Sequence, residues 1–294
     1  IKIEYSVIKG DVFFDHADFS GLVDFDGTKF SGAANFSGSL FSEDAGFSDS
    51  SFQGLAGFSR AHFTTEANFS RARFNDADFG RARFDRGFHL VNARVYTIKL
   101  SDAQFAEGAA IFLKDLNYNR IDVRWNTIKG HVPYNGSVYL TLIKNFRNQE
   151  QYEDQDDCYY QYRKEKQSRS HKPVAGLFDR LAQISCGYGV RVSYTVFWCL
   201  FTILFFGVIF WAGKGMNKFE IEGMELPGDH RLRPSKRVSF TDALYFSIAM
   251  FTTSQAPVNT YPVGFYRHLA MAEGILGWFF LGLFVVVLSA VLIR

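Results

Sequence analysis

Residues 66–84, EANFSRARFNDADFGRARF, place a phenylalanine at every fifth position. Upstream the same residue recurs in alternating steps of five and six, so the series is continuous. Its members are Phe14, Phe19, Phe25, Phe30, Phe36, Phe41, Phe47, Phe52, Phe58, Phe63, Phe69, Phe74, Phe79 and Phe84. Such a step would scatter the rings around an α-helix, which turns every 3.6 residues. The period predicts a solenoid, and we expect a right-handed β-helix with the rings along its axis.

The repeats ADFSG, AANFSG, EANFSRARF and NDADFGRARF resemble the pentapeptide-repeat family in its phenylalanine-centred form, over about residues 13–88. The resemblance implies a four-sided β-helix with one pentapeptide on each side. The extra residue in alternate repeats departs from that pattern, and bulged corners or longer coils would both explain it, so the coil length stays open. Residues 95–125 lose the regular spacing, and we expect them to cap the solenoid, which gives a first domain of residues 1–130.

The charge of this first domain bears on its partners. Residues 10–59 are acidic, residues 60–94 are basic, and the whole chain has a net charge of only +2. Some pentapeptide-repeat proteins mimic DNA through acidic surfaces, but a solenoid with two oppositely charged halves is a poor mimic of DNA. We therefore expect no nucleic-acid partner, and we interpret the solenoid as a rigid scaffold or a sensor.

Residues 131–192 are expected to form a helical connector. Apolar residues recur every four positions from Val138, which predicts one tyrosine-rich helix over about residues 137–168. Further on, Leu177, Leu181 and Ile184 share one helix face, which indicates a helix lying in a membrane interface. Gly187-Tyr188-Gly189 spells part of a potassium-channel filter, but it precedes the first apolar segment and reads as a turn.

Residues 193–294 form the third expected domain. Two apolar segments, about residues 194–212 and 269–293, reach the roughly 20 residues that a membrane-spanning helix needs. Between them, Ser239 and Asp242 match a capping box for a short helix over about residues 240–251. That helix is too short to cross a bilayer and ends in a polar, proline-containing turn. The pattern indicates a re-entrant segment, which is tolerated at membrane depth only when it is buried in protein or lines water.

This third domain resembles the two-transmembrane pore-loop channel superfamily. The matching residues are Asp242-Ala243-Leu244-Tyr245-Phe246-Ser247, Thr252-Thr253, Tyr261-Pro262, Gly264, Arg267, Leu269-Ala270, Glu273, Gly277 and Leu281-Gly282-Leu283. The resemblance implies a homotetramer whose second spans line the inner pore. It also implies that Asp242 and Glu273 support the filter, Glu273 from behind the short helix.

The expected filter is not of the potassium type. It consists of Thr252, Thr253, Ser254, Gln255, Ala256 and Pro257. Potassium filters depend on glycines that place successive carbonyls toward the ion, whereas this loop has no glycine and Pro257 has a restricted φ. No acidic residue lies from residue 248 to residue 266, which argues against strong calcium selectivity. We expect weakly selective conduction of monovalent cations, favoured by the C-termini of the short helices.

Two alternatives to this prediction remain open. The basic residues Arg231, Arg233, Lys236, Arg237 and Arg267 would favour an anion-conducting pore of the same fold. A membrane anchor that conducts nothing and presents the solenoid to a partner is the alternative from another class. Gly277 and Gly282 are candidate hinges for gating, or they allow helices to approach closely.

The chain as a whole is predicted to be a multidomain membrane protein, an N-terminal β-helix followed by an α-helical pore domain. No nucleophile–base pair, phosphate-binding glycine loop or metal-ligand spacing is evident, so we expect neither an enzyme, nor a cofactor, nor a metal site. Cys158, Cys186 and Cys199 show no disulfide pattern, which favours a reduced, cytosolic setting for the solenoid. The expected location is the cell membrane, with more than one span in the lipid bilayer.

Overall fold

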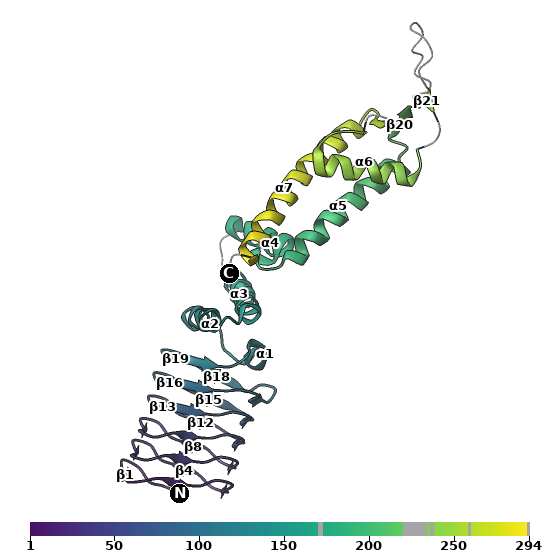
Figure 1. Ribbon diagram of the computed structural model, residues 1–294. Helices are drawn as coiled ribbons and strands as arrows, with labels where there is room; N and C mark the ends of the chain where they lie inside the picture. The colour runs from purple at the N-terminus through teal and green to yellow at the C-terminus, as the bar shows by residue number, and fades with distance from the viewer. Residues whose placement is uncertain (170–172, 220–233, 236–237, 258–259, 293–294) are drawn as a thin grey trace. The chain divides into compact units, whose positions relative to one another are not determined.

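The computed structural model describes residues 1–169, 173–219, 234–235, 238–257 and 260–292 (Figure 1). The chain divides into two compact units, Ile1–Arg169 and Ser170–Arg294. The division falls inside the segment that was expected to be a separate connector.

The first unit begins with a β-solenoid of short parallel strands. The strands are β1 (Val7–Ile8), β2 (Val12–Phe13), β3 (Asp18–Phe19), β4 (Val23–Asp24), β5 (Lys29–Phe30), β6 (Ala34–Asn35), β7 (Leu40–Phe41), β8 (Ala45–Gly46), β9 (Ser51–Phe52), β10 (Ala56–Gly57), β11 (His62–Phe63), β12 (Ala67–Asn68), β13 (Arg73–Asp78), β14 (Arg83–Phe84), β15 (Gly87–His89), β16 (Arg94–Lys99), β17 (Gln104–Phe105), β18 (Ala110–Phe112) and β19 (Asn117–Asp122). Each strand pairs with the strand of the next coil on the same side, for example β3 with β7, β7 with β11 and β11 with β14. The β-solenoid predicted from the phenylalanine series is confirmed.

The strand register settles the coil length. Lys29 pairs with Ser51, 22 positions later, because one turn contains two steps of five and two steps of six. Where steps of five begin to follow one another, a turn contains only one step of six, and His62 pairs with Arg83, 21 positions later. Further on it lengthens again, since Gly87 pairs with Ala110, 23 positions later. The longer-coil explanation of the extra residue therefore holds for the regular part of the series.

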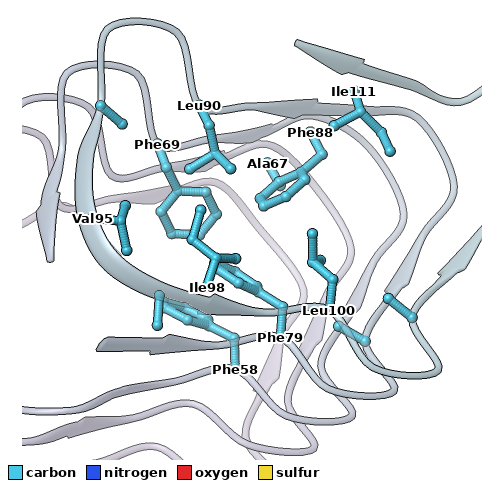
Figure 2. Packing of buried hydrophobic residues seen from close by; sticks show 14 of the residues in the cluster. Phe58, Ala67, Phe69, Phe79, Phe88, Leu90, Val95, Ile98, Leu100 and Ile111 are labelled. Atoms are coloured by element: carbon cyan, nitrogen blue, oxygen red, sulfur yellow. The ribbon is translucent and has the colours of Figure 1, made fainter. Parts of the chain in front are cut away.

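The solenoid interior is a stack of aromatic rings (Figure 2). Rings on the same side of successive coils lie nearly parallel, as Phe36 and Phe58 do with centroids 5.0 Å apart and 2° between their planes. Rings on opposite sides of the coil meet edge to face across the axis, as Phe36 and Phe47 do at 77°. Pairs of either geometry contribute about 0.5–1.5 kcal/mol beyond the burial of their area. Small residues fill the space beside the rings, and the buried Ser39 hydroxyl donates to the carbonyl of Phe14 at 2.5 Å.

The expectation that residues 95–125 cap the solenoid is wrong for most of that range. Strands β16 to β19 continue the coils, and aliphatic side chains take over from phenylalanine in the interior. Ile98 pairs with Ala77 on one side and with Ile121 on the other. Figure 2 shows Leu90, Ile98 and Leu100 in the same interior as Phe69 and Phe79. The phenylalanine period ends earlier than the fold because any large apolar side chain can fill the axis.

The last coil is covered by helices α1 (Trp125–Ile128) and α2 (Gly136–Asn148). The buried face of α2, with Leu142 and Phe146, packs into the same core as the aromatic stack. Asn145 of α2 is buried and bonds to the backbone of Ile121 twice, accepting from its N–H and donating to its carbonyl, both at 2.9 Å. Its amide thus occupies the place that another strand would take against β19.

The single helix expected over residues 137–168 is also corrected. It is interrupted after α2, and α3 (Tyr152–Ser168) begins a separate helix. Glu150 has a left-handed backbone with φ of 59°, which reverses the chain so that α3 packs against α2. Asp154 of α3 is buried, accepts from the backbone N–H of Trp125 at 2.9 Å and pairs with Arg124.

The second unit is helical. Its elements are α4 (Pro173–Cys186), the 3-10 turn η1 (Gly187–Gly189), α5 (Val192–Ala212), β20 (Met216–Phe219), β21 (Pro234–Ser235), α6 (Phe240–Thr253), β22 (Thr260–Pro262) and α7 (Tyr266–Leu292). In the described part of the chain, α5 and α7 are long and apolar enough to cross a membrane. The Gly187-Tyr188-Gly189 sequence forms the turn η1 between α4 and α5.

Candidate functional site

The candidate site lies where α6 packs between α5 and α7 (Figure 1). One face of α6 is apolar and buried, with Phe246 and Met250 in a cluster that includes Phe206 and Phe210 of α5 and Ala270 of α7. The start of α6 is fixed by the capping box predicted from the sequence: Ser239 Oγ accepts from the N–H of Asp242, and Asp242 accepts from the N–H of Ser239, both at 3.1 Å.

The segment formed by α6 and the loop after it begins and ends at the same end of α5. After α5 the chain forms β20, whose Lys218 bonds to Asp242 in the first turn of α6 at 2.8 Å. After α6 the chain returns to β22, which pairs antiparallel with β20 so that Lys218 lies opposite Thr260 and Met216 opposite Pro262. The chain after α6 therefore returns at Thr260 to the end at which α6 begins.

A buried polar cluster joins the three helices behind α6. Ser247 of α6 and Glu273 of α7 are both fully buried. The Ser247 hydroxyl lies 2.7 Å from the carbonyl of Ile203 on α5 and also bonds to Oε1 of Glu273. The other carboxyl oxygen, Oε2, has no hydrogen-bond partner among the described residues. A serine hydroxyl has one proton and can donate to only one of these two acceptors. Both bonds form together when Glu273 is protonated, because Ser247 then donates to Ile203 and accepts from the Glu273 carboxyl group.

Glycines let α7 approach α6. A Cβ atom at Gly277 would overlap the carbonyl oxygen of Phe251, and one at Gly274 would lie 2.9 Å from Ser254 Oγ. The candidate hinge Gly277 is thus a point of close helix contact. At Gly282, the other candidate, a Cβ atom would meet nothing within 4 Å in the described protomer.

The last turn of α6 carries the first two residues of the expected filter. The Thr252 hydroxyl donates to the carbonyl of Ile248 and the Thr253 hydroxyl to that of Ala249, each at 2.7 Å. Both side chains are exposed in the protomer. Since each hydroxyl proton is used within the helix, the oxygen atoms present lone pairs to their surroundings.

Ser254 differs from its neighbours in the expected filter. It ends α6 in a left-handed conformation with φ of 55°, and its hydroxyl accepts from the indole N–H of Trp278 on α7 at 2.8 Å. Its oxygen is therefore bound to α7, on the other side from the two threonine hydroxyls. Sequence reasoning missed Trp278, because a tryptophan in an apolar segment carries no local sign of such a bond.

The remaining filter residues line a hollow of about 660 Å³ on the outer face of α6. Its walls come from β20, from α6, from the returning loop and from β22. The lining residues are Lys218, Asp242, Tyr245, Ile248, Ala249, Thr252, Thr253, Gln255, Ala256, Pro257 and Thr260. Asp242 is thus placed both at the start of α6 and in the wall of this hollow.

Lys218 and Asp242 form the charged end of the hollow. The bond that the Lys218 ammonium donates, followed by the bonds from Ser239, lowers the pKa of Asp242 below its usual value of 3.8, against the opposing effect of burial. Sequence reasoning missed Lys218, which lies outside every motif. Of the basic residues that would favour an anion-conducting pore, Arg231, Arg233, Lys236 and Arg237 lie outside the described residues, and Arg267 is exposed at the start of α7. Among the described residues no group of three or more metal-ligating side chains comes together.

Comparison with known families matches the first unit only. A family model described as pentapeptide repeats (9 copies) matches residues 3–51 and 47–94, which are coils of the solenoid. Neither the curated proteins nor the solved structures give a match to the chain.

Proposed function

We propose that the chain is the subunit of a homotetrameric pore-loop ion channel in the cell membrane, with the solenoid as its cytosolic scaffold or sensor. The observation that carries the proposal is the course of α6 and its loop. They leave and rejoin the same end of the α5–α7 pair, and the loop places polar side chains around a hollow. The length and apolar composition of α5 and α7 support two membrane crossings.

The polar hollow explains why several copies are needed. Backbone and side-chain polar groups cannot face lipid tails, and a loop at membrane depth has to be covered by protein or to line water. In a single protomer the residues from Thr252 to Ala256 are exposed. Copies arranged around an axis would enclose them and leave a polar path. The number four comes from the resemblance to pore-loop channels.

Conduction of monovalent cations fits the chemistry of the hollow better than conduction of anions. The hydroxyl oxygens of Thr252 and Thr253 present lone pairs, and the C-terminal end of α6 carries partial negative charge. No glycine supports a stack of carbonyl rings of the potassium type. Weak cation selectivity is therefore the expected result. The exposed apolar side chains of α4, among them Leu177, Leu181 and Ile184, would lie in the membrane interface.

Purified full-length protein in planar bilayers tests the proposal. We expect single-channel currents. In asymmetric potassium chloride, we expect a reversal potential with the sign of the potassium equilibrium potential. A reversal potential with the sign of the chloride equilibrium potential would instead support the anion-conducting alternative. The absence of current under every ion gradient would support the membrane anchor that conducts nothing. Gln255→Glu should raise the cation preference, while Gln104→Glu, which adds the same charge to a strand of the solenoid, should not. Crosslinking that yields any number of subunits other than four would contradict the tetramer.

A further inference from the structure

The hollow contains a carboxylate that the loop sequence lacks. Residues 248–266 include no acidic side chain. Asp242 nevertheless lines the same hollow as Thr252, Thr253 and Gln255. It does so because positions 242, 245, 249 and 252 recur at helical spacing and share one face of α6.

A cation accompanies this carboxylate. Lys218 reaches the hollow from β20, and its ammonium nitrogen lies 2.8 Å from Oδ1 of Asp242. The two side chains keep 34% and 26% of their surface exposed, so both charges remain in contact with water. Ions in the hollow would therefore be exposed to both charges as well as to the threonine hydroxyls at the other end of α6.

We propose that the Lys218–Asp242 pair sets the charge selectivity of the pore, with Asp242 attracting cations and Lys218 offsetting that attraction. The inference rests on the proposed channel function. In a symmetric assembly each subunit contributes one pair, which gives a ring of carboxylates balanced by a ring of ammonium groups. Rings of charged side chains are a general means by which channels select ions by sign.

The bonding around the pair stabilises the charged form of Asp242. Asp242 accepts from Lys218 through Oδ1 and from Ser239 through Oδ2, so the carboxylate is held as an anion. Removing the ammonium would leave a ring of uncompensated carboxylates. Removing the carboxylate charge would leave a ring of uncompensated ammonium groups. The two changes should therefore shift the selectivity in opposite directions.

The effect of each charge should be modest at ordinary salt. Across roughly 10 Å of water-like medium, one unit charge changes the local concentration of a monovalent ion by about twofold. The Debye length falls from about 30 Å at 0.01 M salt to about 3 Å at 1 M salt. An electrostatic role thus predicts a shift that grows at low salt and disappears at high salt, which a merely structural role does not.

Reversal potentials of the full-length channel in asymmetric potassium chloride test this inference. Lys218→Gln should raise the ratio of potassium to chloride permeability by about twofold or more, and Asp242→Asn should lower it by a similar factor. The exchanged pair, Lys218→Asp with Asp242→Lys, should return the ratio toward that of the unaltered channel. Lys214→Gln, which removes an exposed cation outside the hollow, should leave the ratio unchanged.

The outcomes separate this inference from the function on which it rests. Asp242→Asn also alters the cap of α6 and can fail to assemble, so Lys218→Gln alone is sufficient to decide. If Lys218→Gln conducts with an unchanged permeability ratio at low salt, the inference is overturned while the channel function stands. If the unaltered protein carries no current at all, the channel function itself is overturned.

Discussion

Glu273 of α7 and Ser247 of α6 are both fully buried and are hydrogen-bonded to one another. The same serine hydroxyl contacts the carbonyl of Ile203 on α5. One small polar cluster therefore joins α5, α6 and α7 directly behind the proposed filter. Buried polar groups are costly to leave without partners, so this cluster should position α6 as well as stabilise it.

Removal of the Ser247 hydroxyl tests that cluster. Ser247→Ala leaves the Ile203 carbonyl and Glu273 without their shared partner, and we expect a loss of about 1–3 kcal/mol in stability. Glu273→Gln should cost less, because its amide can donate to Ser247 while Ser247 donates to Ile203. Ser289→Ala is the matched control, since the Ser289 hydroxyl donates to the carbonyl of Val285 within its own helix. Thermal unfolding in detergent provides the measurement, and equal midpoints for Ser247→Ala and Ser289→Ala would contradict the prediction.

The two candidate hinge glycines should respond differently to an added methyl group. Gly277→Ala forces the backbone of Phe251 away and should cost about 1–3 kcal/mol, as overpacking usually does. Gly282→Ala enters open space and should leave the unfolding midpoint unchanged or slightly higher. A Gly277→Ala variant as stable as the unaltered protein would show that the close contact with α6 is not required.

The cap of the solenoid gives a local prediction. Asn145→Ala leaves the N–H of Ile121 without its side-chain partner, at a cost of about 1–3 kcal/mol, while the Ile121 carbonyl keeps the bond from Gln149 Nε2 at 2.8 Å. Hydrogen exchange should accelerate in β19 and much less in the first coils, because coils of a solenoid contact only their neighbours. Asn148→Ala, at an exposed position of the same helix, is the control. Uniform exchange changes along the solenoid would argue against a local cap.

Acid should weaken the solenoid partly through Asp85. Burial alone would raise the pKa of Asp85, but the bonds from Arg83 at 2.8 Å and from His62 at 2.7 Å outweigh it and lower the pKa below 3.8. A carboxyl group with a lowered folded pKa contributes stability above its unfolded pKa and loses it as the pH falls through the folded value. Between pH 6 and pH 3 the unaltered protein should therefore lose more stability than Asp85→Asn. Asp76→Asn, at an exposed position of β13, should follow the unaltered protein.

The fold of the first unit could be predicted because its signal is periodic and local. The spacing of the phenylalanines shows directly which side chains fill the interior. Once the strand register is known, the sum of four successive steps gives the number of residues in one coil. The cap could not be predicted, because Asn145 meets Ile121 through a bond between positions 24 residues apart. Nor does any residue near Glu150 signal the left-handed turn that separates α2 from α3.

In the second unit, the apolar segments and the capping box gave the positions of α5, α6 and α7. The arrangement of side chains around α6 was less accessible. Whether Ser254 faces the loop or α7 depends on Trp278, and the charge of the hollow depends on Lys218 from a strand between the two apolar segments. Contacts of this kind depend on how separate elements pack, which a local sequence pattern does not encode.

The most direct test of the central claim is whether the loop after α6 lines the ion path. Gln255→Cys channels in planar bilayers would be exposed to a charged thiol reagent, with Leu204→Cys on the exposed face of α5 as the control. We expect the reagent to abolish or strongly reduce the current through Gln255→Cys and to leave the current through Leu204→Cys intact. Unchanged current through Gln255→Cys, with modification of the cysteine verified by mass spectrometry, would contradict it.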